Sequence, residues 1–171
     1  MATRISLREY QRGLVERLRS AGATASASSK LGLQVGEDPW LVDLAEAGEL
    51  IPVPPITPVP LTRPWFRGVV NVRGNLYNVV DLPAFLGGAA VSPGEQARLL
   101  VLAERFLMRS ALLVDRSLGL RDPRELRLQS DVPSASPWIR ALYADRDDRI
   151  WRELDVRQLV QHAAFLGVAA A

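Results

Sequence analysis

An internal repeat constrains the fold of this chain more than any other feature of its sequence. The segment PWFRGVVNVR begins at Pro64, and the similar segment PWIRALYADR begins 73 positions later, at Pro137. The similarity continues from NLYNVVDLPAFL at Asn75 to RIWRELDVRQLV at Arg149, with one more residue in the second turn. Each copy has the order strand, turn, strand, aspartate and short amphipathic segment, so we predict two similar, mainly β units and not a parallel α/β sheet. Chance similarity between β-strands is the alternative.

The first copy contains a clear β-hairpin signal. In FRGVVNVRGNLYNVVDL, residues 66–82, two valine-rich runs meet at Gly74-Asn75, a dipeptide that suits a two-residue turn. Alternation along the first strand separates Asn71 and Arg73 from the valines of the opposite face. We therefore predict that this polar face of the hairpin lies outside the core, where the arginine is open to a partner.

Aspartates stand at equivalent places in the two copies. Asp81 and Asp155 each lie between a strand and an amphipathic segment, where a carboxylate can accept hydrogen bonds from the first free amides of a helix. Together with Asp115 they could also be candidates for acid and base catalysis. We favour the structural interpretation, because no partnering histidine is evident and the one histidine, His162, is assigned no function.

The composition indicates a soluble globular protein without a catalytic centre. The 171 residues are 48% hydrophobic, and 21 basic against 19 acidic residues give a net charge of +2, which lends little support to nucleic-acid binding. The chain has no cysteine, a single histidine and no glycine-rich phosphate-binding motif. The longest apolar-leaning stretch, LVQHAAFLGVAAA, has 13 residues, whereas a membrane span needs roughly 20. We expect no catalytic residue, no metal, no cofactor and no insertion into a membrane.

The N-terminal part of the chain differs from the rest. SLRE at residues 6–9 fits a helix capping box, and the apolar spacing that follows predicts a helix over about 7–19. The small residues of AGATASASSK are typical of a flexible linker. We therefore predict a helix and linker at 1–33, a two-lobed domain at 34–166 and a tail at 167–171.

Aromatic and basic residues alternate just before the first hairpin. Arg63, Trp65, Phe66 and Arg67 are spaced as in proteins that bind single-stranded nucleic acid. The other interpretation, which we favour, places both rings in the core and the arginines in water, because Trp138 repeats the position of Trp65.

Glu49 is a candidate partner for the hairpin arginine. It precedes the proline-rich segment between residues 51 and 64, which cannot be helical and is predicted to be extended. From there Glu49 is expected to hold Arg73 in a bidentate ion pair, while the adjacent Gly74 lets a partner's backbone come close.

The hairpin resembles the signature of the CheW family, in which a glycine precedes an N-x-R-G turn and the second strand ends in Asp-Leu, as in GVVNVRGNLYNVVDL. ELIPVPPITPVPLTRPWFRG is similar to the glutamate-led, proline-bounded segment before it. LLVDRSLGL and IWRELDVRQLV resemble the Val-Asp strand and the closing strand and helix of the second lobe. The resemblance covers about residues 36–166, and WFRGVVNVRGNLYNVVDLPAFLGG is most similar to PilI-type members, which serve type IV pilus chemosensory systems.

This resemblance implies a fold of two intertwined five-stranded SH3-like barrels and a protein that is not an enzyme. It implies an adaptor that couples the cytoplasmic tips of methyl-accepting chemoreceptors to the regulatory domain of a CheA-type histidine kinase, in the cytoplasm beside membrane-associated receptor arrays. It marks five residues as partner-binding, with the arginine at the edge of the groove between the lobes: Glu49, Gly68, Asn71, Arg73 and Gly74. The alternatives are a regulatory module of a signalling kinase, against which the short chain argues, and a barrel that binds single-stranded nucleic acid.

Overall fold

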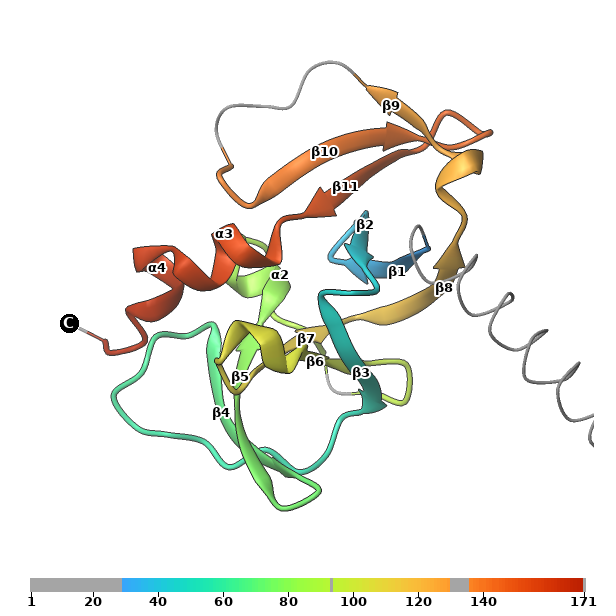
Figure 1. Cartoon of the computed structure of the whole chain (residues 1–171). Coiled ribbons are helices and arrows are strands. Elements are labelled where there is room, and N and C mark those ends of the chain that lie inside the picture. Colours follow the sequence, from blue (N-terminus) through green and yellow to red (C-terminus); the bar gives the residue numbers. More distant parts are fainter. Residues whose placement is uncertain (1–28, 93, 130–135, 171) are drawn as a thin grey trace, which may run out of the picture.

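Two β-sheets make up most of the computed structural model, which describes residues 29–92, 94–129 and 136–170 (Figure 1). The predicted helix over 7–19 lies outside the described residues. The five-stranded sheet contains, in spatial order, β3 (Ala47–Pro52), β6 (Arg98–Leu102), β7 (Ser110–Val114), β5 (Asn75–Asp81) and β4 (Phe66–Val72). The six-stranded sheet contains β8 (Arg116–Arg121), β1 (Lys30–Val35), β2 (Asp38–Asp43), β11 (Ile150–Leu154), β10 (Ile139–Ala144) and β9 (Arg127–Gln129).

The two sheets have the same order of equivalent strands. β3, β6, β7, β5 and β4 of the first sheet correspond to β8, β1, β2, β11 and β10 of the second, and β9 is added at the edge. β5 pairs in parallel with β7, as β11 does with β2. Because β2 precedes the first hairpin in the chain but pairs with the second, the two halves exchange strands. The predicted mainly β fold of two intertwined lobes is confirmed, and we call them the five-stranded lobe and the six-stranded lobe.

The first hairpin forms as predicted, but its turn is shifted by one residue. Val72 pairs with Asn75, so the two turn residues are Arg73 and Gly74 and not Gly74-Asn75. Both have positive φ, 51° and 83°, as a two-residue turn that matches the strand twist requires. The Gly74 N–H donates to Asn71 Oδ1 at 2.8 Å. The predicted position of the turn was wrong. The hydrogen bond from the Gly74 amide to the Asn71 side chain, three residues earlier, stabilises a turn at Arg73-Gly74 instead.

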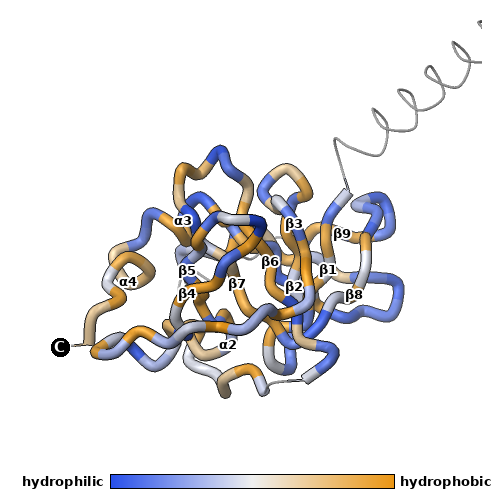
Figure 2. The backbone as a smooth tube through the Cα atoms, turned by 90° about the horizontal axis from the view of Figure 1, so that it is seen from below, coloured by the Kyte–Doolittle hydropathy of each residue, from blue (hydrophilic) through white to orange (hydrophobic). Residues whose placement is uncertain are grey.

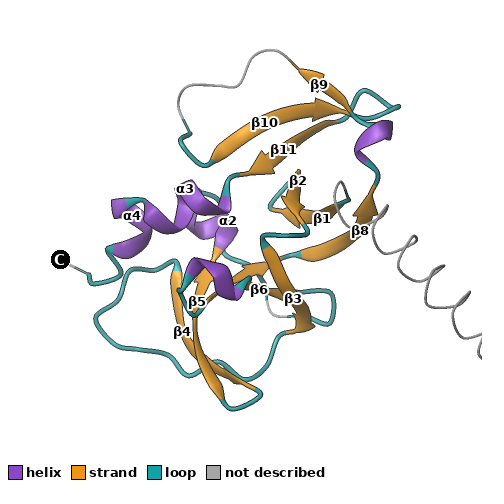
Figure 3. Ribbon diagram, in the orientation of Figure 1, coloured by secondary structure: helices purple, strands orange, loops and turns teal. Residues whose placement is uncertain are grey.

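Short helices follow the second strand of each hairpin (Figure 3). α2 (Leu82–Phe85) and α3 (Val156–Gln161) start at the predicted aspartates: Asp81 Oδ1 accepts from the Ala84 N–H at 3.1 Å, and Asp155 Oδ1 accepts from the Gln158 N–H at 2.9 Å. α4 (Ala163–Leu166) follows α3 after a break at His162, whose Nδ1 accepts from the Ala164 N–H. Both predicted helix caps are confirmed. No described helix is long and apolar enough to cross a membrane.

The main core lies between the two sheets and joins them. Apolar residues follow β6 and β7 through the middle of the molecule, while polar residues gather in the outer loops (Figure 2). Phe66 is buried in this core, and the half-buried Trp65 packs edge-on against Phe85, which in turn contacts Trp138. The interpretation of the hairpin aromatics as core anchors is therefore confirmed, but the expectation that the arginines face water is wrong for Arg67, which is partly buried and pairs with the buried Asp81.

Ordered backbone extends beyond both expected limits of the domain. β1 begins at Lys30, so the expected boundary between 33 and 34 falls inside a strand. At the other end, within the segment expected to be a tail, the Ala170 N–H donates to the Leu61 carbonyl, and the Val168 carbonyl accepts from the Arg63 N–H. The C-terminal sequence GVAAA consists mostly of small residues without apolar periodicity, so the sequence did not predict the backbone hydrogen bonds of Val168 and Ala170.

Candidate partner-binding surface

The predicted ion pair between Arg73 and Glu49 is present at the end of the first hairpin. Arg73 Nη2 lies 2.6 Å from Glu49 Oε1, in a single contact and not the bidentate pair that we expected. Glu49 lies on β3, and Arg73 directly follows β4. These two strands are the edges of the five-stranded sheet, so the ion pair joins both edges. The Arg73 side chain is 79% exposed, which leaves most of it accessible to a partner.

The other three predicted residues have local structural roles. Asn71 and Gly74 form the turn that presents Arg73, as described above. Gly68 is buried and has a φ of 125°, and Thr57 and the neighbouring Val69 exchange two backbone hydrogen bonds of 2.8 Å across it. A Cβ at position 68 would lie 2.0 Å from the Thr57 carbonyl oxygen. Gly68 thus lets the proline-rich segment pair with β4 at close range, through the antiparallel bridge of Thr57 with Val69.

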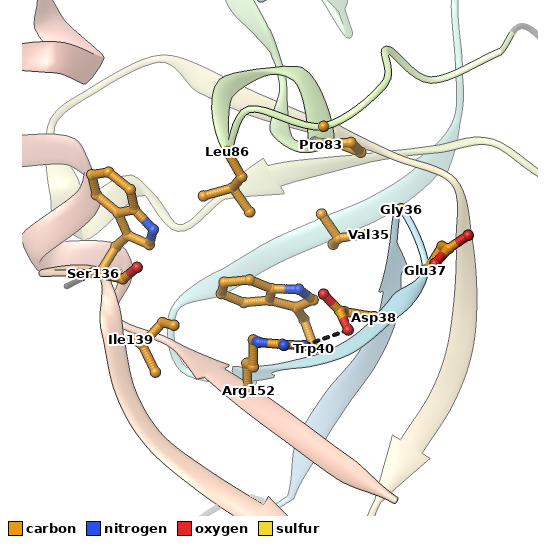
Figure 4. Close-up of a pocket in the computed structure, with 12 residues that line it drawn as sticks. Val35, Gly36, Glu37, Asp38, Trp40, Pro83, Leu86, Ser136, Ile139 and Arg152 are labelled. Carbon is orange, nitrogen blue, oxygen red and sulfur yellow. Dashed lines mark ion pairs between the residues drawn. The ribbon is translucent and has the colours of Figure 1, made fainter. Parts of the chain in front are cut away.

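The expectation that Arg73 lies at the edge of the groove between the lobes is corrected by the structure. The turn of the β4–β5 hairpin points away from the six-stranded lobe (Figure 1). A pocket of about 380 Å³ lies instead between α2 and the six-stranded sheet, lined by Leu86, Trp40 and Trp138 and by the ion pair of Arg152 with Asp38, at 2.6 Å (Figure 4). None of the five predicted residues lines this pocket, because they lie on β3, on β4 and in the hairpin turn, at the two edges of the five-stranded sheet.

A second ion pair of the same kind lies at the end of the second hairpin. Arg146 Nη2 is 3.1 Å from Glu125 Oε1, and the Arg146 side chain is also 79% exposed. Arg146 is the repeat equivalent of Arg73, since PWFRGVVNVR and PWIRALYADR both end in this arginine. Sequence reasoning missed the second pair, although these final arginines were a signal that could have indicated it.

Each arginine tip has an exposed aliphatic side chain beside it. Leu76 is the second residue of β5, and Ile150 stands 74 positions later at the start of β11. Both are exposed, although large apolar side chains are usually buried. We define the first tip surface as Glu49, Arg73 and Leu76, and the second tip surface by its residues Glu125, Arg146 and Ile150.

A further pair of repeated contacts lies deeper in the molecule. Arg67 Nη1 is 3.1 Å from Asp81 Oδ2, and Arg140 Nη2 is 3.4 Å from Asp155 Oδ1. Burial raises the pKa of Asp81. Burial alone would also raise the pKa of Asp155, but hydrogen bonds from the Gln158 amide and the Arg140 guanidinium outweigh it, so this pKa is lowered.

We expect the two capping aspartates to affect stability with opposite pH dependence. The lowered pKa of Asp155 contributes stability that is present above its ordinary value of 3.8 and is lost as pH falls through the folded pKa. The raised pKa of Asp81 contributes stability that is present below 3.8 and is lost as pH rises through the folded pKa. Asparagine caps a helix about as well as aspartate, so Asp155→Asn should lose only the charge-dependent part of this stability, at neutral pH and much less in acid.

Urea unfolding followed between about pH 3 and pH 7 would measure this difference. Relative to the unmodified chain, the free-energy cost of Asp155→Asn should grow as pH rises, and that of Asp81→Asn should shrink. Parallel pH profiles for the two variants would contradict the assignment.

Comparison with known proteins places this architecture in a family. Residues 30–164 match the profile described as the CheW-like domain. This chain belongs to the CheW-like domain family. The match covers most of the described lobes and confirms the resemblance carried by the first hairpin and the second-lobe strands.

Individual relatives of this CheW-like domain agree with the assignment. Protein PilI of Pseudomonas aeruginosa is 29% identical over 145 residues, which cover 82% of this chain and 80% of PilI. Chemotaxis protein CheW of Thermotoga maritima is 33% identical over 91 residues, 53% of this chain and 58% of that protein. The crystal structure of the scaffolding protein TtCheW from Thermoanaerobacter tengcongensis has the same fold, with a TM-score of 0.66 at 17% identity over 80% of this chain and 94% of that one.

Proposed function

We propose that this CheW-like domain is a non-catalytic adaptor that couples the cytoplasmic tips of methyl-accepting chemoreceptors to the regulatory domain of a CheA-type histidine kinase. Its similarity to PilI over four-fifths of both chains supports a role in a type IV pilus, or twitching motility, chemosensory pathway. The names of the other two relatives, a chemotaxis protein and a scaffolding protein, agree with such a role. The protein would act in the cytoplasm, beside membrane-associated receptor arrays.

The two matching tip surfaces are the observation that carries this proposal. An adaptor has to contact two partners at the same time, and the β4–β5 and β10–β11 hairpins project to opposite ends of the molecule (Figure 1). Each tip combines an accessible arginine, a carboxylate that orients it and an exposed aliphatic side chain. Apolar contact surrounded by complementary charge is typical of protein surfaces that bind specifically and reversibly.

Three acidic side chains with structural contacts support a role without catalysis. Asp81 and Asp155 cap α2 and α3, and Glu153 is paired with Lys30 at 2.8 Å. These carboxylates therefore already have structural partners. The alternative of nucleic-acid binding lacks a stacking platform at Trp65 and Phe66, because these rings pack against other aromatic rings.

Isothermal calorimetry of the full chain with each proposed partner tests the function. We expect micromolar binding to the kinase regulatory domain, and a ternary complex when a receptor-tip fragment is added. Absence of binding to both partners would contradict the adaptor role. A single-stranded oligonucleotide serves as the control, since phosphate-driven binding would strengthen steeply as salt is lowered.

A further inference from the structure

Glu46 lies where the chain passes from the six-stranded lobe to the five-stranded lobe. It ends the turn between β2 and β3. Its N–H donates to the carbonyl of Asp43, the last residue of β2, at 2.8 Å, and its carbonyl accepts from the N–H of Ala103, directly after β6, at 3.0 Å. The residue is only 5% exposed. The backbone of Glu46 is thus bonded to both lobes.

The carboxylate of Glu46 also contacts cations from both lobes. Its Oε1 accepts a hydrogen bond from Nη2 of Arg140, on β10 of the six-stranded sheet, at 2.6 Å. Nη2 of Arg105, in the 3₁₀ turn η1 (Glu104–Phe106) that follows β6, lies 3.7 Å from the same oxygen. One buried oxygen therefore connects a cation of each lobe.

Arg140 extends this contact into a cluster of charges. It lies 3.3 Å from Glu153 and 3.4 Å from Asp155, and Glu153 in turn pairs with Lys30 at 2.8 Å. Burial and the neighbouring Glu153 carboxylate raise the pKa of Tyr143 to about 12. A buried charge is tolerated when it is paired, and losing one partner leaves the others uncompensated. We call the three carboxylates and three cations the junction cluster: Lys30, Glu46, Arg105, Arg140, Glu153 and Asp155.

The junction cluster is not a requirement of the repeated fold. Among the residues that the structure describes, the first copy has only the equivalent pair of Arg67 and Asp81. Val79 occupies the position that corresponds to Glu153 and is fully buried in an apolar cluster. The same strand arrangement is therefore built in the five-stranded lobe without these additional charges, so their presence at the junction calls for its own explanation.

The second oxygen of Glu46 is left without a hydrogen bond. Oε2 is buried and accepts from no donor among the described residues. A buried acceptor without a donor is unfavourable, and any arrangement that admits water to it would remove that penalty. The junction thus combines the directional hydrogen bond from Arg140 with a buried carboxylate oxygen that accepts no hydrogen bond.

We propose that Glu46 is a positioning residue that holds the two lobes in one relative orientation and so sets the placement of the two tip surfaces. Apolar packing between the sheets is not directional, whereas Arg140 donates a directional hydrogen bond to Glu46 Oε1, and the nearby charge of Arg105 attracts the same oxygen from the other lobe. Loss of the Glu46 charge releases this constraint and widens the range of lobe orientations. The property concerns the free protein and does not depend on the identity of its partners.

Distances between the lobes in solution test this proposal. The chain has no cysteine, so Leu76→Cys and Ile150→Cys allow spin labels to be placed at one exposed position on each lobe. Double electron–electron resonance on the full chain would compare Glu46→Gln with Asp38→Asn. The control loses a carboxylate that pairs with Arg152 at 2.6 Å within the six-stranded lobe. We expect Glu46→Gln, and not the control, to displace or broaden the distance distribution.

A purely structural role would have a different signature. Glu46→Gln would then lower the unfolding temperature while the distance distribution of the folded protein stayed the same, and this result would overturn the proposal. If Glu46→Gln does not fold, Arg105→Gln removes only the cation of the five-stranded lobe, from a half-exposed position. A distribution for Arg105→Gln that matches that of the control would overturn the proposal equally.

Discussion

Replacing Gly68 with alanine is expected to destabilise the fold by about 3 kcal/mol, since the variant combines backbone strain with overpacking. The φ of Gly68 is 125°, which side chains other than glycine rarely adopt. The added Cβ would lie 2.0 Å from the Thr57 carbonyl oxygen and 2.7 Å from its carbonyl carbon. These are backbone atoms, so the proline-rich segment itself has to move away from β4.

Gly74→Ala is the matched control for this effect. Gly74 also has a positive φ, 83°, but a Cβ added there would have no atom within 4 Å other than those of its own residue and its chain neighbours. Its substitution should cost about 1 kcal/mol, from the left-handed conformation alone. Urea unfolding followed by tryptophan fluorescence measures both variants. Equal losses of unfolding free energy in the two variants would show that the close contact with Thr57 does not cause the destabilisation of Gly68→Ala. The result also bears on partner binding, because Gly68 has to be tested for folding before any binding defect is assigned to it.

Reversing the charge of Arg73 is expected to weaken partner binding at the first tip surface at least about tenfold, or about 1.4 kcal/mol. Arg73→Asp removes the exposed guanidinium and places a second carboxylate beside Glu49, so the surface changes from a balanced pair to a doubly negative one. The folded state should be little affected, because an exposed ion pair contributes little to stability.

Arg146→Asp provides the equivalent change at the second tip surface, with an arginine of the same exposure and a partner carboxylate in Glu125. Calorimetry with the kinase regulatory domain and with the receptor-tip fragment should show that each reversal weakens binding at its own tip, while circular dichroism stays the same. If both reversals leave the affinities for both partners unchanged, the tips are not the docking surfaces, even where the unmodified chain binds.

Much of the fold is predictable because it depends on local patterns. The repeat from Pro64 and Pro137 correctly indicated two similar β units, since the alternation of a strand and the residues of its turn are encoded within a few positions. Asp81 and Asp155 were recognised as helix caps for the same reason, because a cap binds an amide only three residues away.

The candidate surface was predictable only in part. Glu49 and Arg73 were expected to meet, and they do, although in one contact and at the outer end of a lobe. The matching Arg146 and Glu125 were missed. The turn was also misplaced by one residue, because the hydrogen bond of the Asn71 side chain selects Arg73 and Gly74 as the turn residues.

By itself, the sequence determined the mainly β class, the duplication, the helix caps and the family, since each of these depends on short-range pattern or on motif residues. Only the tertiary structure decided which strands are exchanged between the lobes, why position 68 has to be glycine, and how charges gather at the junction. Glu46 meets Arg140 over a separation of 94 residues, and Lys30 meets Glu153 over 123. Such contacts arise when packing brings distant strands together, and the residues next to each partner in the sequence carry no sign of them.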